Sequence, residues 1–372
     1  MLIRINLYAN FATGTLGRLA WEKTESQETG PPTKLTCTRV TLQEMHMHTL
    51  PKKALLGVFL VLIVVFSLFA GGQASTSQPV LPAPSDGFPL EVVDDLGSSV
   101  LLDRKPETIV SLSLFSDEIL LEMLPASRFA AITSLAQSPV YSNVAQKAQG
   151  ISPVIEFNTE TIISLYPDLV IAANWSEADK IAQLRQAGIQ VYQIDTPFNI
   201  EGVRRGIERL GTLTGEPEAA RNLIASMDSR LDSLTNVIAT IPQNERLTAL
   251  DYNTWGTANG GDTTWNLVLN LAGITNAVAH LEAGDFGQVP LSKEVLVDLD
   301  PDLLFLPGYI WGEDDGAQAF YDQVRNDPAL TGLKAITNDA LFIFPERLKG
   351  TYSHYLVEAA EHAARIAYPQ LF

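Results

Sequence analysis

The chain has 372 residues, which suggests two domains, and its hydrophobic content of 46% supports a sizeable core. The formal charge is −18 at pH 7, so a broad basic surface for nucleic acid is not expected. The single cysteine, Cys37, excludes a disulfide framework, a cysteine-rich zinc site and an iron–sulfur cluster. These properties indicate an acidic globular protein.

One segment near the start of the chain has the order of a secretory leader. Lys52 and Lys53 precede an apolar run from Ala54 to Ala70, and Gly72-Gln73-Ala74 follows with small residues at its ends. This order predicts a signal peptide of the Sec type that is cleaved after Ala74. A retained membrane anchor is the alternative, because the run is close to the shortest length that spans a bilayer.

The segments around this leader carry further expectations. Residues 1–44 look like neither a leader nor a domain, so we suspect that translation begins at Met45 or Met47. No cysteine follows the apolar run, which argues against a lipid anchor on cysteine. Removing residues 1–74 takes away more basic than acidic residues and leaves a more acidic exported protein. Residues 75–89, rich in Pro, Ser, Gly and Ala, are expected to form a flexible tether.

Short apolar runs separated by helical stretches follow along the chain. The expected strands are Leu90–Val93 and Val100–Leu102 as a hairpin, then Thr108–Ser113, Phe129–Thr133, Leu169–Ala173, Gln190–Ile194, Leu247–Tyr252, Leu303–Leu306 and Leu341–Phe344. Most are apolar along their full length, as expected for a parallel sheet with helices on both faces. The alternation predicts an α/β fold.

One stretch, Glu216–Ile241, has a longer helical pattern than its neighbours. Pro217 suits a first helical position, and apolar residues recur from Ala220 to Ile241 at helical spacing. The stretch lies near the middle of the expected mature chain. Both a rigid strut between two lobes and a crossover helix of a single sheet fit this pattern.

Two segments of the chain repeat one pattern. Each has a glutamate, Glu160 or Glu294, followed by leucine five residues later and by Pro-Asp-Leu after that. Each also has a residue that can cap a helix two positions before the glutamate, Asn158 or Ser292. The pattern predicts a short helix, a stop at proline and a buried strand. Duplication of a half-domain and a shared functional surface both explain the repeat.

The first of these segments resembles a known signature. Its order Asn158-x-Glu160-x-Ile-x-x-Leu-x-Pro-Asp-Leu-Val is similar to the first-lobe signature of the periplasmic solute-binding proteins that serve iron-siderophore, haem and vitamin B12 ABC importers. The hairpin at 90–102 and the helix at 216–241 fall where that family has its opening hairpin and its single interlobe helix. The resemblance covers roughly the whole expected mature chain.

The resemblance implies a fold, a ligand site and a partner. The fold is two lobes, residues 90–215 and 242–372, each with a mostly parallel sheet flanked by helices, and the ligand is held between them. Glu160 and Glu294 match the glutamates that meet arginines on the permease dimer. The chain departs from the family at 153–155, where Pro-Val-Ile stands in place of a pocket Trp that cobalamin binders can have. That departure counts against cobalamin.

Aromatic and basic residues follow the predicted strands in both halves. In open α/β sheets, ligands bind beyond the carboxyl ends of the strands, and aromatic side chains there suit a bulky chelate or macrocycle. For Arg347, an ordinary surface position and bidentate contact with a ligand oxygen both remain open. The candidate ligand residues are Phe115, Trp175, Tyr252, Trp255, Tyr309, Trp311 and Arg347.

Other site chemistries have weaker support in this sequence. Only His280, His354 and His362 remain in the expected mature chain, too few for a convergent zinc cluster, although His354 between tyrosines could ligate haem. The sequence has no P-loop, no G-x-S-x-G and no H-E-x-x-H motif. We therefore expect a monomeric, exported binding protein without a cofactor, with a ferric siderophore as ligand and a membrane permease as partner. Cobalamin or haem is the alternative ligand, and a chelatase-like enzyme on a related scaffold is the alternative class.

Overall fold

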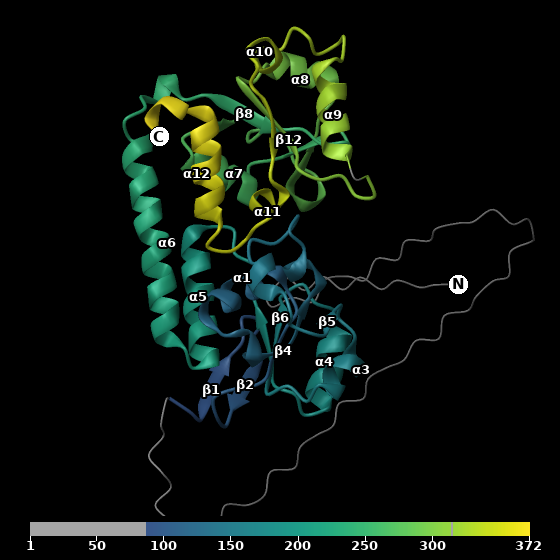
Figure 1. Cartoon of the computed structure of the whole chain (residues 1–372), viewed down its shortest axis with the longest axis vertical. Helices are drawn as coiled ribbons and strands as arrows, with labels where there is room; N and C mark the ends of the chain where they lie inside the picture. Colours follow the sequence, from purple (N-terminus) through teal and green to yellow (C-terminus); the bar gives the residue numbers. More distant parts are fainter. Residues whose placement is uncertain (1–86, 314) are drawn as a thin grey trace, which may run out of the picture. The chain divides into compact units, whose positions relative to one another are not determined.

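The computed structural model describes residues 87–313 and 315–372 (Figure 1). The predicted leader lies outside this part of the chain, and so does the predicted tether up to residue 86. None of the helices in the described part is both long enough and apolar enough to cross a bilayer.

The first lobe is built on a five-stranded sheet in the order β5-β4-β3-β6-β7, in which all neighbours are parallel. An antiparallel hairpin precedes it. Its strands are β1 (Leu90–Val93), β2 (Ser99–Leu102), β3 (Ile109–Ser111), β4 (Phe129–Thr133), β5 (Val154–Ile155), β6 (Leu169–Ala173) and β7 (Val191–Ile194). Its helices are α1 (Leu114–Met123), α2 (Ala145–Ala148), α3 (Thr159–Ser164), α4 (Ala178–Gln186) and α5 (Ile200–Thr214).

The second lobe repeats this plan with a four-stranded parallel sheet in the order β10-β8-β12-β13. A short antiparallel pair, β9 with β11, lies beside it. The strands are β8 (Thr248–Asp251), β9 (Thr257–Asn259), β10 (Thr275–Asn276), β11 (Gln288–Pro290), β12 (Leu303–Pro307) and β13 (Leu341–Phe344). The helices are α7 (Thr264–Leu271), α8 (Lys293–Leu299), α9 (Gly316–Arg325), α10 (Lys334–Thr337), α11 (Glu346–Lys349) and α12 (Leu356–Ala367).

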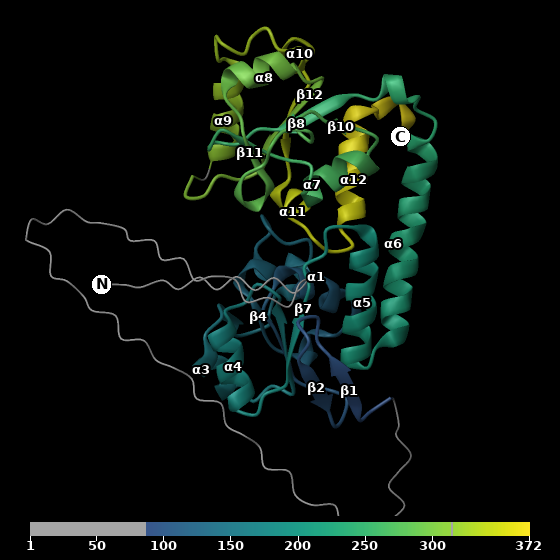
Figure 2. The same cartoon turned by 180° about the vertical axis from the view of Figure 1, so that it is seen from behind.

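Consecutive residues of the central strands enter different cores, because successive side chains of a strand point to opposite faces of the sheet. In the first lobe, Ile109 joins one hydrophobic cluster with α1 and α5, whereas Val110 joins another with α3 and α4. In the second lobe, Phe305 packs with α7 and α12, whereas Leu306 packs with α8 and α9 (Figure 2). Helices therefore cover both faces of each sheet, which explains the fully apolar strands.

A single helix, α6 (Pro217–Ile238), connects the two lobes. It packs against α5 of the first lobe and against α12 and α7 of the second (Figures 1 and 2). Its buried residues Ala220, Met227 and Leu234 join one hydrophobic cluster that also contains strand residues of both sheets. The expectation of two lobes joined by one long helix is confirmed, and the alternative of a single sheet is wrong.

The strands that the sequence predicted are all present, with ends that differ by at most two residues. Four strands of two or three residues were not predicted, namely β5, β9, β10 and β11. Three of them have polar or mixed sequences, such as Thr275-Asn276 in β10, and the apolar β5 (Val154–Ile155) has only two residues. Such short strands depend on their neighbours in the sheet, so a local pattern does not reveal them.

Candidate functional site

The strand order places a ligand position at the same point of each sheet. In the first lobe the chain runs from β3 outward to β5 and then returns to the other side of β3 with β6. In the second lobe it runs from β8 to β10 and returns with β12 on the other side of β8. Crevices outside the carboxyl ends of strands at such reversals are the usual ligand positions in open α/β sheets. The loops after β3, β6, β8 and β12 therefore define the candidate site.

Three of the predicted ligand residues stand out into solvent from these loops. Trp175 follows β6 and is 72% exposed, Trp255 follows β8 and is 85% exposed, and Trp311 follows β12 and is 82% exposed. The turn that carries Trp255 is held by a side chain, since Asn253 Oδ1 accepts hydrogen bonds from the backbone N–H groups of Trp255 and Thr257. These large indole rings are not covered by other described residues, so their surface is available for contact with a ligand.

Two of the predicted ligand residues belong to the cores instead. Phe115 is the second residue of α1 and faces inward, where its ring packs so closely on Gly206 of α5 that a Cβ there would lie 2.7 Å away. Tyr252 is buried in the second-lobe core with its ring 5.9 Å from that of Phe320. These positions contradict the prediction that both side chains line a cleft. Trp265, which was not among the predicted ligand residues, packs on Phe305 and Phe344 in the core.

The two cationic side chains after β13 already have partners within the protein. Lys349 Nζ lies 2.8 Å from the carboxylate of Asp251, and both side chains are almost fully buried. Arg347 donates from Nη1 to Asn143 Oδ1 at 2.9 Å and lies 3.5 Å from Glu358 Oε1. The strand ends therefore present aromatic area and little uncompensated positive charge.

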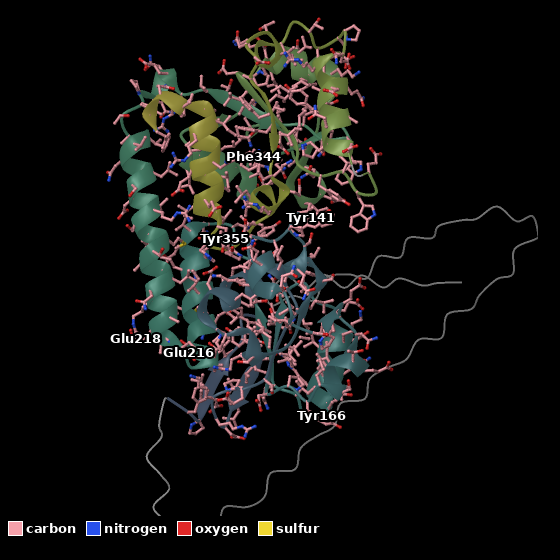
Figure 3. All side chains as sticks on the ribbon, in the orientation of Figure 1. Tyr141, Tyr166, Glu216, Glu218, Phe344 and Tyr355 are labelled. Atoms are coloured by element: carbon pink, nitrogen blue, oxygen red, sulfur yellow. The ribbon has the colours of Figure 1, made fainter. Side chains whose placement is uncertain are left out.

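Aromatic side chains of the two lobes touch at the junction. The rings of Tyr141 and Tyr309 meet edge to face with centroids 5.6 Å apart, and Tyr141 lies where the lobes meet (Figure 3). Burial, Tyr309 and Glu346 together raise the pKa of Tyr141. On the side of β7, Phe198 and Tyr352 make a second edge-to-face contact at 6.3 Å. The lobes are thus in contact on both sides of the candidate site.

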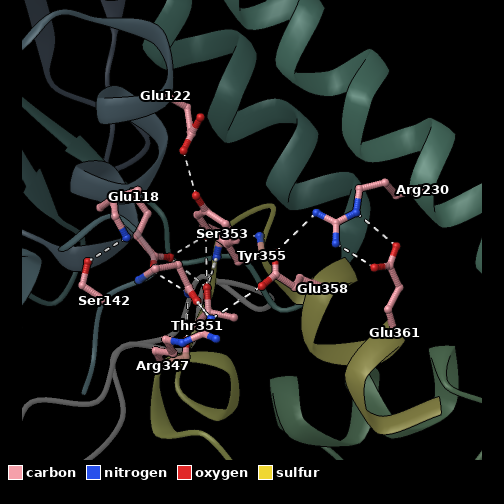
Figure 4. Close-up of polar contacts among 12 residues, drawn as sticks. Glu118, Glu122, Ser142, Arg230, Arg347, Thr351, Ser353, Tyr355, Glu358 and Glu361 are labelled. Carbon is pink, nitrogen blue, oxygen red and sulfur yellow. Dashed lines mark hydrogen bonds and ion pairs between the residues drawn. The ribbon is translucent and has the colours of Figure 1, made fainter. Parts of the chain in front are cut away.

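A buried carboxylate that the sequence did not reveal lies at this junction. Glu118 of α1 is fully buried and accepts hydrogen bonds from four groups (Figure 4). Its Oε1 accepts the backbone and side-chain N–H groups of Asn143 at 3.0 and 2.8 Å, and its Oε2 accepts the hydroxyls of Thr351 and Ser353 at 2.9 and 2.5 Å. Burial raises the pKa of Glu118, and the hydrogen bonds from Ser353 and Asn143 oppose that shift.

A second carboxylate of α1 also reaches across the junction. Glu122 accepts a hydrogen bond from Tyr355 of the second lobe at 2.7 Å and pairs with Lys147 at 2.6 Å. Burial and the hydrogen bond to Glu122 raise the pKa of Tyr355, so the phenol remains a donor. Burial lowers the pKa of the neighbouring His354 to about 4, which keeps this imidazole neutral near pH 7.

The repeated segments fold alike in the two lobes. Asn158 caps α3 by accepting from the Thr161 N–H at 2.8 Å, and Ser292 caps α8 by accepting from the Val295 N–H at 3.3 Å. The aspartates of the two Pro-Asp pairs also do one task. Asp168 Oδ2 accepts the N–H and hydroxyl of Thr108 before β3, and Asp302 Oδ2 accepts those of Thr248 at the start of β8. The caps and the aspartates of the repeat are therefore structural.

The glutamates of the repeat have no comparable task. Glu160 and Glu294 are both exposed in the first turns of α3 and α8, and neither has an ion-pair partner among the described residues. The Ser292 hydroxyl lowers the pKa of Glu294, so this carboxylate is charged at neutral pH. A residue that recurs at the same place in both lobes, exposed and without an ion-pair partner among the described residues, is a candidate for contact with a partner.

Other kinds of site have little support in residues 87–313 and 315–372. No group of three His, Cys, Asp or Glu side chains there converges as a metal-ion site. A hollow of roughly 410 Å³ lies between Phe198 and the start of α7, but none of the predicted ligand residues lines it.

The fold and the loops at the two sheet reversals define a two-lobed binding protein. A family model described as periplasmic binding protein matches residues 109–348, and the chain belongs to this family. It is a substrate-binding protein of an ABC importer. The expectation of that class from the sequence is confirmed.

Relatives agree with this assignment, and solved structures share the fold. The chain is 26% identical over 329 residues to the uncharacterised ABC transporter substrate-binding lipoprotein YvrC of Bacillus subtilis. This alignment covers 86% of the present chain and 99% of YvrC. It is 26% identical over 252 residues to a cobalamin-binding protein of Halobacterium salinarum, covering 66% of each chain. Among solved structures, the molybdate-binding protein MolA of Haemophilus influenzae superposes with a TM-score of 0.64 at 18% identity, covering 76% of this chain and 92% of that one.

One of these names bears on anchoring. YvrC is named a lipoprotein, whereas the only cysteine of this chain, Cys37, precedes the apolar run at 54–70. The relative therefore stands against our expectation that the protein has no lipid anchor. Both Cys37 and the apolar run lie outside the described residues.

Proposed function

We propose that this protein captures a bulky, weakly charged metal chelate between its lobes and delivers it to a membrane permease. A ferric siderophore of the hydroxamate type is the first candidate. The observation that supports it is the compensation of the basic residues at the strand ends, Lys349 by Asp251 and Arg347 by Asn143 and Glu358. A strongly anionic ligand would find no free cation there, and burying its charge without a partner is costly.

The exposed indoles supply the other half of this argument. Trp175, Trp255 and Trp311 come from both lobes and follow strands at or beside the sheet reversals. Aromatic side chains of this size can bury 150–250 Å² each, so a few of them can cover much of a large chelate. Neutral hydroxamate chelates and corrinoids suit such a site better than catecholates, which carry a high negative charge.

Cobalamin is the second candidate. A relative that covers 66% of this chain is named a cobalamin-binding protein, and the corrinoid shares the bulk and weak charge of the first candidate. Against it stands the segment 153–155, Pro-Val-Ile, which lies where cobalamin binders of this family can have a pocket Trp. Haem, with its two carboxylates, has less support from the compensated cations.

A titration series tests the ligand proposal. Tryptophan fluorescence and calorimetry would be recorded with ferrichrome, cyanocobalamin, haemin and ferric enterobactin. We expect ferrichrome or cyanocobalamin to bind at least tenfold more tightly than ferric enterobactin, and Trp175→Ala and Trp311→Ala to weaken that binding. Trp265→Phe, a change in the core, serves as control for fluorescence. Tightest binding of ferric enterobactin would contradict the proposal.

The partner proposal concerns the repeated glutamates. We infer that Glu160 and Glu294 dock the two lobes onto arginines of the permease dimer, as the family resemblance implies. Exposed carboxylates contribute little to folding, and isolated surface ion pairs are worth about 0–1 kcal/mol. On docking each would become a buried, hydrogen-bonded pair, and removal of one partner of such a pair costs about 2–5 kcal/mol.

Uptake by cells that carry the cognate permease tests docking separately from ligand binding. Glu160→Ala with Glu294→Ala should abolish most uptake while the ligand affinity and the melting temperature stay close to those of the parent. Glu177→Ala with Glu282→Ala, two other exposed acidic residues of the two lobes, is the matched control. Normal uptake by the first double variant would disprove docking, and loss of ligand binding would move these glutamates into the ligand site.

A further inference from the structure

The segment that carries Arg347 is held by the first lobe at two places. Arg347 donates to Asn143 Oδ1, and Asn143 Nδ2 donates back to the Arg347 carbonyl at 2.8 Å. A few residues further on, Thr351 and Ser353 donate their hydroxyls to Glu118. All of these bonds run between residues more than 200 positions apart in the chain.

Glu118 decides the orientation of the Asn143 amide. A carboxylate can only accept hydrogen bonds, so the Asn143 side chain must present Nδ2 to Glu118 Oε1, and its Oδ1 then points to Arg347. The same nitrogen reaches the Arg347 carbonyl, so one amide holds both the guanidinium and the backbone of that residue. Figure 4 shows Glu118, Arg347, Thr351 and Ser353 gathered in one polar cluster.

We propose that Glu118 is a positioning residue for the ligand site: it fixes Arg347 through Asn143 and fastens residues 351–353, so the lobes separate at the site only when this cluster opens. The argument rests on three facts about Glu118. It is fully buried, all of its hydrogen-bond partners are donors, and these donors come from both lobes. An acceptor that loses its donors in such a place carries a large desolvation cost, so the cluster opens and closes as a unit.

The proposal rests on the proposed function for the ligand itself, and it adds that Arg347, while still paired with Asn143 and Glu358, lies at the ligand site. A measurement without ligand therefore comes first. Hydrogen exchange would be followed in the full-length protein at residues 347–357, with strands β6 and β12 as internal references. In Thr351→Val with Ser353→Ala, which removes both hydroxyl donors and keeps most of the packing, exchange at 347–357 should accelerate at least tenfold. The reference strands should exchange as in the parent.

Two further variants make the test specific. In Glu118→Gln the amide oxygen can face Asn143 while its NH₂ group donates to the two hydroxyls, which can rotate to accept. This variant should keep exchange at 347–357 within about threefold of the parent. Thr240→Val, an exposed threonine at the end of α6 whose hydroxyl bonds only to Val237, should change nothing. Parent-like exchange at 347–357 in the Thr351→Val, Ser353→Ala protein would overturn the proposal.

The ligand arm is separate. Dissociation rates of ferrichrome and cyanocobalamin would be compared between the parent and the Thr351→Val, Ser353→Ala protein. Faster exchange at 347–357 together with at least threefold faster dissociation of the bound probe supports the positioning role. Faster exchange with an unchanged dissociation rate would overturn the role in ligand positioning. Failure of both probes to bind the parent would count against the proposed ligand class and leave the exchange result to decide on the cluster.

Discussion

The two lobes are alike in their repeated segments and different in how each holds a buried aspartate. Asp251, at the end of β8, lies against Lys349 and also accepts from the backbone and side chain of Asn259. Asp117, in α1 after β3, accepts from the N–H and hydroxyl of Thr133 through Oδ2 and has no cationic partner among the described residues. The repeated segments have equivalent helix caps and aspartate hydrogen bonds in both lobes, whereas the buried aspartates differ in the partners that compensate them.

The largest effect on stability should come from breaking the paired acid. Asp251→Asn removes the negative charge beside Lys349 and leaves that ammonium buried without a charged partner, and its NH₂ group must face one of the donors that Asp251 accepts. Removing one member of a buried ion pair costs about 3–5 kcal/mol, and we expect a loss of this size in the free energy of unfolding. Denaturant titration measures it, with Asp262→Asn in the nearby exposed turn as control. An unchanged midpoint would show that the pair does not hold the second lobe.

Asp117, which has no cationic partner in the described part of the chain, should lower the stability of the protein when it is charged, so its effect should depend on pH. Burial raises the pKa of Asp117 from 3.8 to about 7. Because this pKa is higher in the folded protein, the stability from the protonated acid is fully present below about pH 4. It is lost as the pH rises through about 7, and the total amounts to at most about 4 kcal/mol.

Asp117→Asn removes that titration and tests it. Relative to the parent, the variant should gain melting temperature steadily between pH 4 and pH 7 and then level off. Thermal melts of the two proteins across this range give the difference directly. A difference that does not change with pH would mean that Asp117 does not titrate in this window, and the contrast with Asp251 would then be lost.

The repeated aspartates offer a finer contrast. Asp302 Oδ2 accepts both bonds from Thr248, so the oxygen of an asparagine can replace it. Asp168 uses both oxygens, because Arg104 donates to Oδ1 at 2.8 Å while Thr108 and the Glu107 N–H donate to Oδ2. Burial would raise the pKa of Asp168, but the bonds from Arg104 and Thr108 lower it to about 2.

These differences predict unequal costs for one substitution. Asp168→Asn must turn its NH₂ group toward a donor and should lose about 1–3 kcal/mol, whereas Asp302→Asn should lose less than about 1 kcal/mol. Equilibrium unfolding at pH 7 compares the two. The Asp168 contribution is present above about pH 4 and is lost as the pH falls through about 2, so the gap between the variants should close in acid. Equal losses at pH 7 would contradict the assignment.

Much of the fold could be predicted because its determinants are local. Strands such as Leu169–Ala173 are apolar throughout, and α6 has both a proline at its start and a helical stripe. The repeat singled out Glu160 and Glu294 as candidate docking residues. The structure explains the other repeated residues, because they cap helices or accept hydrogen bonds from the starts of strands. The ends of the strands were also predicted to within two residues. Trp175, Trp255 and Trp311 were therefore placed correctly on exposed loops that follow strands.

The rest depends on contacts that a local pattern does not contain. Phe115 follows β3 as predicted, but α1 begins at Leu114 and turns its ring toward Gly206, which is far along the chain. Glu118 is hydrogen-bonded by Thr351 and Ser353, which lie more than 230 positions away in the sequence, so its role cannot be seen in a local pattern. One signal was present: Asp117-Glu118 is an acidic pair within the otherwise largely apolar stretch 112–124, and buried acids need partners.

The smallest predicted effect concerns the residue before each repeated proline. Tyr166 and Asp300 both adopt left-handed backbone conformations, with φ of 47° and 38°. Asp300 suits this place, since its Oδ1 accepts from the Lys334 N–H at 2.8 Å, whereas the Tyr166 side chain is 85% exposed (Figure 3). Left-handed backbone is unfavourable for most side chains, and asparagine tolerates it better.

Tyr166→Asn should therefore raise the free energy of unfolding by up to about 1 kcal/mol, and Tyr166→Val should lower it. Denaturant titration of the three proteins checks the order. The same proteins would then be assayed for uptake, because Tyr166 follows α3, the short helix that carries Glu160. A more stable Asn variant with normal uptake shows that the tyrosine only tolerates its backbone. A more stable variant with impaired uptake shows that the strained tyrosine belongs to the docking surface. The two lobes would then differ at this position, with a docking side chain at Tyr166 in the first lobe and a structural one at Asp300 in the second.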